Sequence, residues 1–265
     1  MNWLKYGTKE NGGGKMNFIQ ETDREQEFFC REHGLKYRGK PFILFGVEHA
    51  PICPLCEKKY DEQKEREEKK MQDEIKIQRF GKMNIEPMYF DKKISDYLPE
   101  NESQVKAKNA VEKIISGELK ELILLGNNGL GKTLLGSIAV QAVSGGAIYS
   151  AYEIGLLVRG SYNDSNEFET LDRLARLPIL VIDEYEKCKT SKASNDMFSY
   201  ILDKRHSRSL RTILLSNYHL RKSCEKGGCD ECFESVLTND LISRFRQNGK
   251  IIEMSGEDYR RKNRG

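Results

Sequence analysis

The chain of 265 residues contains no long apolar run: no stretch approaches the roughly 18 residues that a membrane-spanning helix needs. Its first residues, Met1 to Tyr6, also lack the apolar core of a secretory signal peptide. These two absences argue against a membrane partner. We therefore expect a soluble, cytoplasmic protein.

The chain also carries little net charge and has no internal repeat. A formal net charge of +3 is too small to indicate nucleic-acid binding by itself. Charged residues make up 32% and hydrophobic residues 38%, so the chain can build a core and still keep a large solvated surface. The length predicts one large domain or two smaller ones.

The most informative motif that is present reads G-x-x-x-x-G-K-T, the phosphate-binding P-loop. Its glycines allow successive backbone N–H groups to point at a phosphate. A strand at 121–125 precedes the motif and a helical pattern from Leu134 to Val143 follows it, as a true P-loop requires. The predicted nucleotide-binding residues are Gly126, Asn127, Asn128, Gly129, Leu130, Gly131, Lys132, Thr133 and Leu134.

Within the P-loop, two side chains have predicted roles. Lys132 would place a positive charge at the β- and γ-phosphates, and the Thr133 hydroxyl would hold Mg²⁺. About 50 residues further on, the apolar run 178–182 ends in Asp183 and Glu184, which fits a Walker B strand. Asp183 would hold the same Mg²⁺ through water, and Glu184 would orient and polarise the attacking water.

Two further polar residues are catalytic candidates. Asn217 follows the apolar strand 211–216 and would contact the attacking water or the γ-phosphate as a sensor, although asparagine at a strand end more often begins a turn. Arg244 lies in the amphipathic segment 240–246. It would act as a finger that reaches the γ-phosphate of a neighbouring subunit; the alternative is a solvated arginine on a helix.

From Met83 onward, apolar strands alternate with amphipathic helices. This alternation predicts an α/β fold with a parallel sheet covered by helices on both faces. The first helix would begin at Ser103 as its N-cap and end at Gly117. The other expected elements are a strand at 147–150, helices within 153–176 and at 195–206, and a last strand near 250–254.

The seven cysteines are clustered, which in a reducing compartment indicates metal binding rather than disulfides. The first group combines a Cys-x2-His pair and a Cys-x2-Cys pair, a spacing typical of tetrahedral zinc, with a small hairpin expected between the pairs. His49 is a rival to the histidine of this group. The predicted zinc ligands are Cys30, His33, Cys53 and Cys56.

A second group lies in a glycine-rich stretch between the sensor strand and Arg244. Three cysteines within nine residues of a polar loop are not typical of packing residues. A second zinc site is one interpretation, with His219 or a residue elsewhere as its fourth ligand. The candidate ligands are His219, Cys224, Cys229 and Cys232, whereas Cys188 stands alone as a structural or free thiol.

Composition changes along the chain predict four regions. From Glu57 to Arg79, 16 of 23 residues are charged, eight of each sign, which favours an exposed helix or a solvated linker that closes at Gly81. The predicted regions are a flexible segment at 1–24, a zinc-binding domain at 25–60, a charged helical linker at 61–82 and an ATPase domain at 83–265; that the domain at 25–60 binds a partner is implied only by the family resemblance given next.

With these motifs assembled, residues 83 to 260 resemble the DnaC/IstB-type branch of the AAA+ ATPases. The resemblance depends on the P-loop, Ile-Asp-Glu at 182–184, the segment 197–206, Leu-Leu-Ser-Asn ending at 217, Leu-Ile-Ser-Arg ending at 244, and Asp-Tyr-Arg at 258–260. It implies that Arg244 is the trans-acting finger and that Arg260 senses nucleotide. The family's terminal motif has Ser where this chain has Asp258, and the Cys-rich insertion at 224–232 departs from the general pattern.

The resemblance also implies a function. Members that load helicases grip a hexameric replicative DNA helicase through a small N-terminal domain, bind single-stranded DNA, and self-associate with ATP into a ring or spiral. Such a protein would use ATP, Mg²⁺ and Zn²⁺. The alternative is an IstB-like transposition ATPase acting on duplex DNA, which the N-terminal Cys pairs disfavour. Candidate DNA contacts are Tyr149, Tyr152, Arg159, Lys187, Lys189 and Lys192.

Overall fold

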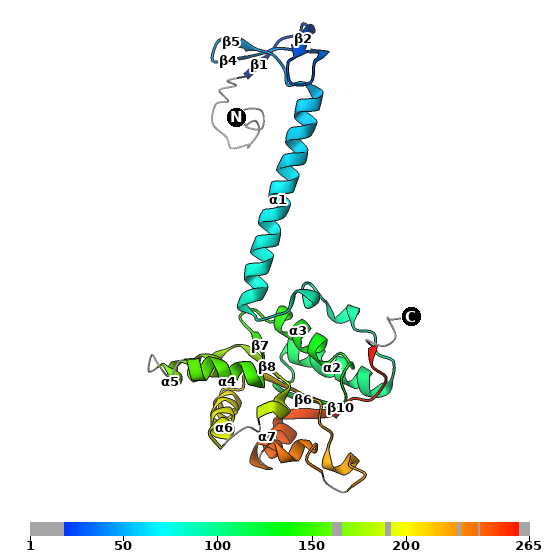
Figure 1. The fold of residues 1–265 in the computed structure, drawn as a ribbon, viewed down its shortest axis with the longest axis vertical. Helices are drawn as coiled ribbons and strands as arrows, with labels where there is room; N and C mark the ends of the chain where they lie inside the picture. The colour runs from blue at the N-terminus through cyan, green and yellow to red at the C-terminus, as the bar shows by residue number, and fades with distance from the viewer. Residues whose placement is uncertain (1–18, 161–165, 189–191, 227–228, 238, 260–265) are drawn as a thin grey trace. The chain divides into compact units, whose positions relative to one another are not determined.

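The computed structural model describes residues 19–160, 166–188, 192–226, 229–237 and 239–259 (Figure 1). The chain divides into two compact units, Met1–Glu74 and Ile75–Gly265. Within the described part of the chain, no helix is long and apolar enough to cross a membrane.

The first unit is built from short antiparallel strands. Strands β2 (Gln26–Cys30) and β3 (Leu35–Gly39) form a hairpin. Strands β1 (Ile19–Glu21), β4 (Phe42–Leu44) and β5 (Val47–His49) form a three-stranded sheet in the order β1-β4-β5. The hairpin predicted between the two candidate metal-binding pairs is formed by β4 and β5, whereas the β2–β3 hairpin carries the first pair.

The first unit has almost no apolar core. Besides Pro41, the buried side chains among its described residues are Cys30 and Cys53. So little buried apolar surface rarely stabilises a fold of this size, and small domains with this deficit generally rely on disulfides or a metal ion.

The charged stretch forms one long helix, α1 (Pro54–Lys82). Its exposed acidic and basic residues include the i,i+4 pair Lys64–Glu68, with the Nζ–Oε1 distance at 3.4 Å. The prediction that Gly81 closes the helix was wrong, because the helix continues through Gly81 to Lys82. Asn84, which adopts a positive φ of 53°, then turns the chain away.

The second unit contains a five-stranded parallel sheet, as predicted. Its strands are β6 (Glu121–Leu125), β7 (Ala147–Ser150), β8 (Ile179–Asp183), β9 (Arg211–Ser216) and β10 (Gly249–Glu253). They lie in the order β10-β6-β9-β8-β7, and every pairing is parallel. The strand that leads into the P-loop therefore has the sensor strand β9 as its neighbour, followed by the Walker B strand β8.

Helices cover both faces of this sheet. Strand side chains alternate: Leu122 and Leu124 face a core shared with α2 (Glu102–Ser116) and α3 (Lys132–Ala142). Ile123 and Leu125 face the opposite core, to which the remaining helices contribute. Those helices are α4 (Ala151–Gly160), α5 (Glu167–Arg176), α6 (Lys192–Ser207) and α7 (Asn239–Asn248).

The ends of α2 test the predicted helix boundaries. Gly117 caps the C-terminus with φ at 85°, as predicted. The N-cap is Asn101 rather than Ser103, because the Asn101 side chain accepts the Gln104 backbone N–H. The Ser103 hydroxyl instead donates to the Asn101 side chain.

A buried arginine fixes α6 against the sheet. Arg205 is fully buried, and its guanidinium donates to the Thr212 hydroxyl at 3.0 Å and to the carbonyls of Leu174 and Leu177 at 3.0 and 2.8 Å. Burial lowers the pKa of Arg205 to about 9. These bonds join α5, α6 and β9, so they hold the sensor strand in place.

Candidate active site

The polar residues predicted from three separate motifs meet at one edge of the sheet. Because β9 lies between β6 and β8, the carboxyl ends of these parallel strands bring the P-loop, Asn217 and Asp183 together. One open cavity of about 990 Å³ is lined by Lys132, Thr133, Asp183, Glu184 and Asn217 among others. Its size suits a nucleotide.

The glycines of the P-loop are required by close backbone contacts. Gly126 has φ at 129°, and a Cβ there would lie 2.2 Å from the Met254 carbonyl oxygen. Gly129 has φ at 79°, and a Cβ there would lie 1.8 Å from the Asp258 carboxylate. A side chain at either position would push away the C-terminal segment that packs over the loop.

The Lys132 side chain is buried and holds the loop in shape. Its Nζ donates to the carbonyls of Gly126 at 2.6 Å and Asn127 at 2.8 Å, and to the Asn217 amide oxygen at 3.0 Å. The ammonium group therefore lies at the point where β6 and β9 end, where it can meet a phosphate.

The predicted magnesium ligands are adjacent. The Thr133 hydroxyl donates to the Asp183 carboxylate at 2.7 Å. Burial raises the pKa of Asp183, and the Thr133 hydroxyl opposes this effect. A hydroxyl beside a half-buried carboxylate is an oxygen donor set of the kind that Mg²⁺ prefers, so these two residues fit the ion.

Glu184 has an unusual backbone and a specific partner. Its φ is 50°, a left-handed conformation that glutamate rarely adopts, and its backbone N–H donates to the Asp183 carboxylate at 2.8 Å. Its carboxylate accepts from Lys187 Nζ at 2.7 Å. Such local strain is common at functional sites, where the surrounding structure fixes a side chain in one orientation.

Sequence reasoning missed Glu186, which orients Asn217. The Asn217 amide donates to Glu186 Oε1 at 2.8 Å, and its backbone N–H donates to Oε2 at 3.2 Å. The Asn217 amide oxygen accepts a hydrogen bond from Lys132 Nζ, so both ends of the Asn217 side chain are fixed. The sequence offered one sign of this residue, an acidic side chain two residues after Glu184. That position alone does not indicate a contact with Asn217, which follows a different strand.

The pocket also has a wall that no motif predicted. Tyr97 and Leu98 line it, and the Tyr97 hydroxyl donates to the Leu130 carbonyl at 3.1 Å. The Leu130 side chain is buried in the core and is not among the residues that line the cavity. Tyr259 lines the same cavity, and its backbone N–H donates to the Gly129 carbonyl at 3.1 Å. No local sequence pattern places these segments beside the P-loop.

Of the two candidate arginines, the structure describes Arg244, and it is not part of this pocket. Arg244, on α7, forms an ion pair with Asp203 of α6 and is partly exposed. It is absent from the described lining of the nucleotide cavity, so within one subunit the structure does not bring it to the P-loop residues. Arg260 lies outside the described residues.

The first Cys/His cluster comprises Cys30, His33, Cys53 and Cys56, whose ligand atoms all lie within 4.8 Å of one another. Cys30 Sγ is 3.5 Å from His33 Nδ1 and 3.6 Å from Cys56 Sγ, and Cys56 Sγ is 3.4 Å from His33 Nδ1. The rival, His49, is exposed and stacks on Phe42 with ring centroids 5.4 Å apart. The four predicted residues therefore fit a zinc ion by donor type and spacing.

The second Cys/His cluster comprises His219, Cys224, Cys229 and Cys232, and its ligand atoms also lie within 4.8 Å of one another. His219 follows Asn217 by two residues and lies three residues beyond Ser216, the last residue of β9. The cluster therefore belongs to the ATPase unit and lies close in sequence to Asn217, the predicted sensor.

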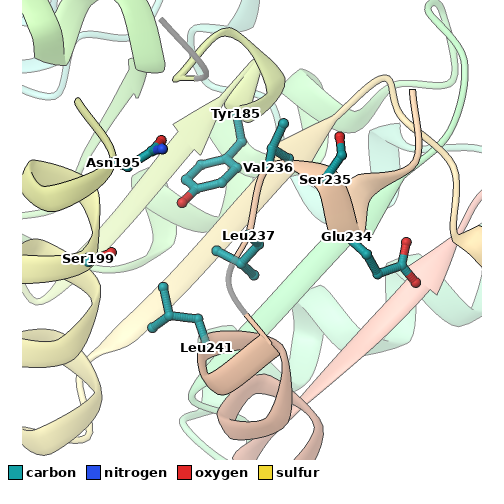
Figure 2. A pocket seen from close by; sticks show the side chains of 8 residues that line it. All are labelled: Tyr185, Asn195, Ser199, Glu234, Ser235, Val236, Leu237 and Leu241. Carbon is teal, nitrogen blue, oxygen red and sulfur yellow. The ribbon is translucent and has the colours of Figure 1, made fainter. Parts of the chain in front are cut away.

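A separate cavity of about 270 Å³ shares no lining residue with the nucleotide pocket. Figure 2 shows Tyr185 between Asn195 and Ser199 of α6 on one side and the segment Glu234–Leu237 on the other, with Leu241 of α7 below. It adjoins the chain between the second Cys/His cluster and α7, and no sequence motif predicted it.

Residues 59–265 match the family model described as IstB-like ATP binding protein. The chain belongs to this family. It is accordingly a AAA+ P-loop ATPase, and its parallel sheet with helices on both faces agrees with the expected fold. The matched region begins after Cys56, so the first Cys/His cluster lies outside it.

Individual relatives point to replication proteins. The replicative helicase loader DnaC of Escherichia coli (strain K12) is 26% identical over 196 residues, covering 70% of this chain and 80% of DnaC. The crystal structure of the DnaC helicase loader superimposes with a TM-score of 0.54 at 21% identity, covering 64% of this chain and all of that one. The replication initiator DnaA bound to AMPPCP and single-stranded DNA gives a TM-score of 0.52 at 18% identity, covering 65% of this chain and 51% of DnaA. At these identities the two structures establish a shared fold.

Proposed function

We propose that this protein is an ATP-dependent loader of a hexameric replicative DNA helicase. The observation that carries the proposal is the pairing of a AAA+ ATPase unit with a separate Cys/His unit that has its own small fold. In this proposal residues 25–60 form the zinc-binding, partner-binding domain, 61–82 the charged linker and 83–265 the ATPase domain, after a flexible segment at 1–24.

Exposed apolar side chains support a partner-binding role for the first unit. Phe45 and Val47, at the β4–β5 turn, are 72% and 58% exposed, and Phe29 on β2 is 60% exposed. Burying these apolar side chains would stabilise a unit that has so little core, but its fold leaves them exposed. Their exposure favours a protein surface as their binding partner.

The residues of the pocket support ATP hydrolysis by the following division of roles. Lys132 binds the phosphates, while Thr133 and Asp183 would hold Mg²⁺, and the bound ion would neutralise phosphate charge. Glu184 accepts the proton of the attacking water, and Asn217, positioned by Glu186, holds that water or the γ-phosphate. Arg260, which follows Tyr259 in the sequence, would sense the nucleotide.

Arg244 is proposed to complete the site of a neighbouring subunit in an ATP-dependent ring or spiral. Its partial exposure and its place outside its own nucleotide pocket support a role in trans. Arg244→Ala is therefore expected to abolish hydrolysis in isolation. Mixing it with Lys132→Ala subunits should restore part of the activity, because some interfaces then combine an intact P-loop with an intact arginine.

The measurement for Arg244 is steady-state phosphate release from each variant alone and from mixtures. Arg246→Ala is a matched control, because Arg246 is an exposed arginine on the same helix. If Arg244→Ala alone were as active as the control, Arg244 would have no part in hydrolysis. If mixing restored no activity, the shared site would be contradicted.

Single-stranded DNA binding is also part of the proposal. Tyr152, on α4, is 57% exposed and remains a candidate for stacking on a base. Tyr149 lies on β7 and packs against the core, and Lys187 is paired with Glu184, so both are weaker candidates. Lys189 lies outside the described residues.

The test of the loader function is co-elution of the purified full chain with the hexameric replicative helicase of the organism that encodes it. We expect a complex with the unaltered chain and with Lys132→Ala when both are tested in ATP. Cys53→Ser, which removes a ligand of the first cluster, and Phe45→Ser, which leaves that cluster intact, should both lose the complex. No complex, together with ATP-dependent assembly on duplex DNA, would instead favour the IstB-like transposition ATPase.

A further inference from the structure

We propose that the second Cys/His cluster binds a structural Zn²⁺ that fixes residues 219–232 beside the P-loop. The metal site itself does not depend on the loader function. Its consequence for the ATPase depends on the proposed roles of Asn217 and Arg244, which lie on either side of the cluster in sequence.

The distances within the cluster match those of a tetrahedral site. Cys229 Sγ is 3.8 Å from Cys232 Sγ, and His219 Nε2 is 3.4 Å from Cys229 Sγ and 3.6 Å from Cys232 Sγ. Zinc bound at about 2.3 Å from sulfur and about 2.0–2.1 Å from nitrogen would place two sulfurs about 3.8 Å apart and a sulfur and a nitrogen about 3.6 Å apart. Cys224 is the fourth member of this cluster.

A disulfide explains the arrangement of these four residues less well than a zinc ion does. The Cys229 and Cys232 sulfurs lie far beyond the roughly 2.05 Å of an S–S bond. A disulfide would also leave Cys224 and His219 without a reason to converge on the other two. Three thiolates and one imidazole are together a complete ligand set for structural zinc.

The segment needs such a ligand because it lacks a core. Leu220 and Cys232 are buried, but none of the described residues between them is. The segment therefore buries too little apolar surface to offset the conformational entropy lost when it is ordered. A bound metal supplies that stabilisation in segments of this kind.

The cluster is connected to the nucleotide site by short contacts. The Gly126 N–H at the start of the P-loop donates to the Tyr218 carbonyl at 3.2 Å, next to His219. The Phe233 N–H, next to Cys232, donates to the His219 carbonyl at 2.8 Å. Fixing His219 to Cys232 therefore also fixes the backbone that follows Asn217.

The chain that leaves the cluster forms a wall of the smaller cavity. Phe233 packs against Tyr185, with ring centroids 5.9 Å apart, and residues Glu234–Leu237 face α6 across the cavity (Figure 2). The same chain then continues toward α7, which carries Arg244. The metal would thus fix the start of the connection between the sensor strand and the arginine helix.

Zinc content of the purified full chain tests the site directly. Measured by mass spectrometry of metals, the unaltered chain should hold about two zinc ions, and Cys53→Ser should retain about one. Cys229→Ser should also retain about one, and the double variant none. Cys188→Ser is the matched control, since Cys188 is a buried cysteine outside both clusters, and it should keep both ions.

Cys53→Ser leaves the second cluster intact, so its zinc content tests the second site even if Cys229→Ser does not fold. A Cys53→Ser chain that is folded by circular dichroism but holds no zinc would overturn the proposal. A Cys229–Cys232 disulfide found in the unaltered chain under reducing purification would overturn it as well. Neither outcome depends on helicase binding.

Limited trypsin digestion tests whether the metal fixes the segment. Arg221, Lys222 and Lys226 are cleavage sites within it. Cys229→Ser should be cleaved there at least tenfold faster than the unaltered chain, whereas Cys53→Ser should be cleaved there at the unaltered rate. Equal cleavage of Cys229→Ser and the unaltered chain would contradict the fixing role.

Discussion

Replacing Lys132 with alanine is expected to weaken ATP binding by at least about 100-fold, or about 2.7 kcal/mol. The variant loses a buried positive charge at the end of β6, and hydrogen bonds between charged groups are the stronger kind. It also leaves the Gly126 and Asn127 carbonyls and the Asn217 amide without the ammonium that now bridges them. The shape of the P-loop should therefore suffer together with its charge.

The measurement is a titration with a fluorescent ATP analogue in the presence of Mg²⁺. Lys113→Ala provides the control, since Lys113 is an exposed lysine on α2, and it should bind like the unaltered chain. Circular dichroism should show both variants folded. Unchanged affinity in a folded Lys132→Ala chain would contradict the assignment of the P-loop.

Replacing Glu184 with glutamine is expected to separate binding from hydrolysis. The amide keeps the size of the side chain but cannot accept a proton from water, so turnover should fall by roughly 10²–10⁴-fold while ATP affinity stays within a few-fold. The substitution also removes the ion pair between Glu184 and Lys187. Both side chains of this pair are more than one third exposed, so the pair adds little to the stability of the fold.

Phosphate release and nucleotide titration should be measured on the same preparation. Glu112→Gln, an exposed position on α2, is the control for the chemical change alone. A Glu184→Gln chain that hydrolyses ATP at the unaltered rate would remove Glu184 from the mechanism. In that case Glu186, two residues away and bonded to Asn217, would become the residue to test next.

Local sequence rules were sufficient for the elements that bear the chemistry. The P-loop, the Walker B pair and the sensor each follow an apolar strand, and parallel strands present their carboxyl ends at one edge of the sheet. Both Cys/His groups were also visible from spacing: the first consists of two pairs with two-residue separations, which suit ligands of one metal, and the second has three cysteines within nine residues. Their convergence to within 4.8 Å agrees with that interpretation.

Other features were decided only by contacts between distant segments. The positioning of Asn217 by Glu186 joins residues 31 apart, and the contact of Tyr259 with Gly129 joins the end of the chain to the P-loop. Tyr97 reaches the Leu130 carbonyl from a segment that has no motif. No local pattern encodes such pairings, because they depend on how the sheet is ordered and on what packs over its edge.

By itself, then, the amino-acid sequence determined the α/β class, the parallel strands, the nucleotide motif and the two groups of candidate metal ligands. Periodicity and spacing are properties of neighbouring residues, so they can be interpreted without a fold. The tertiary structure decided that α1 runs through Gly81, that His33 rather than His49 joins the first cluster, and that Arg244 lies outside its own pocket. Each of these outcomes depends on packing among residues far apart in the chain, which the free energy of the whole fold selects.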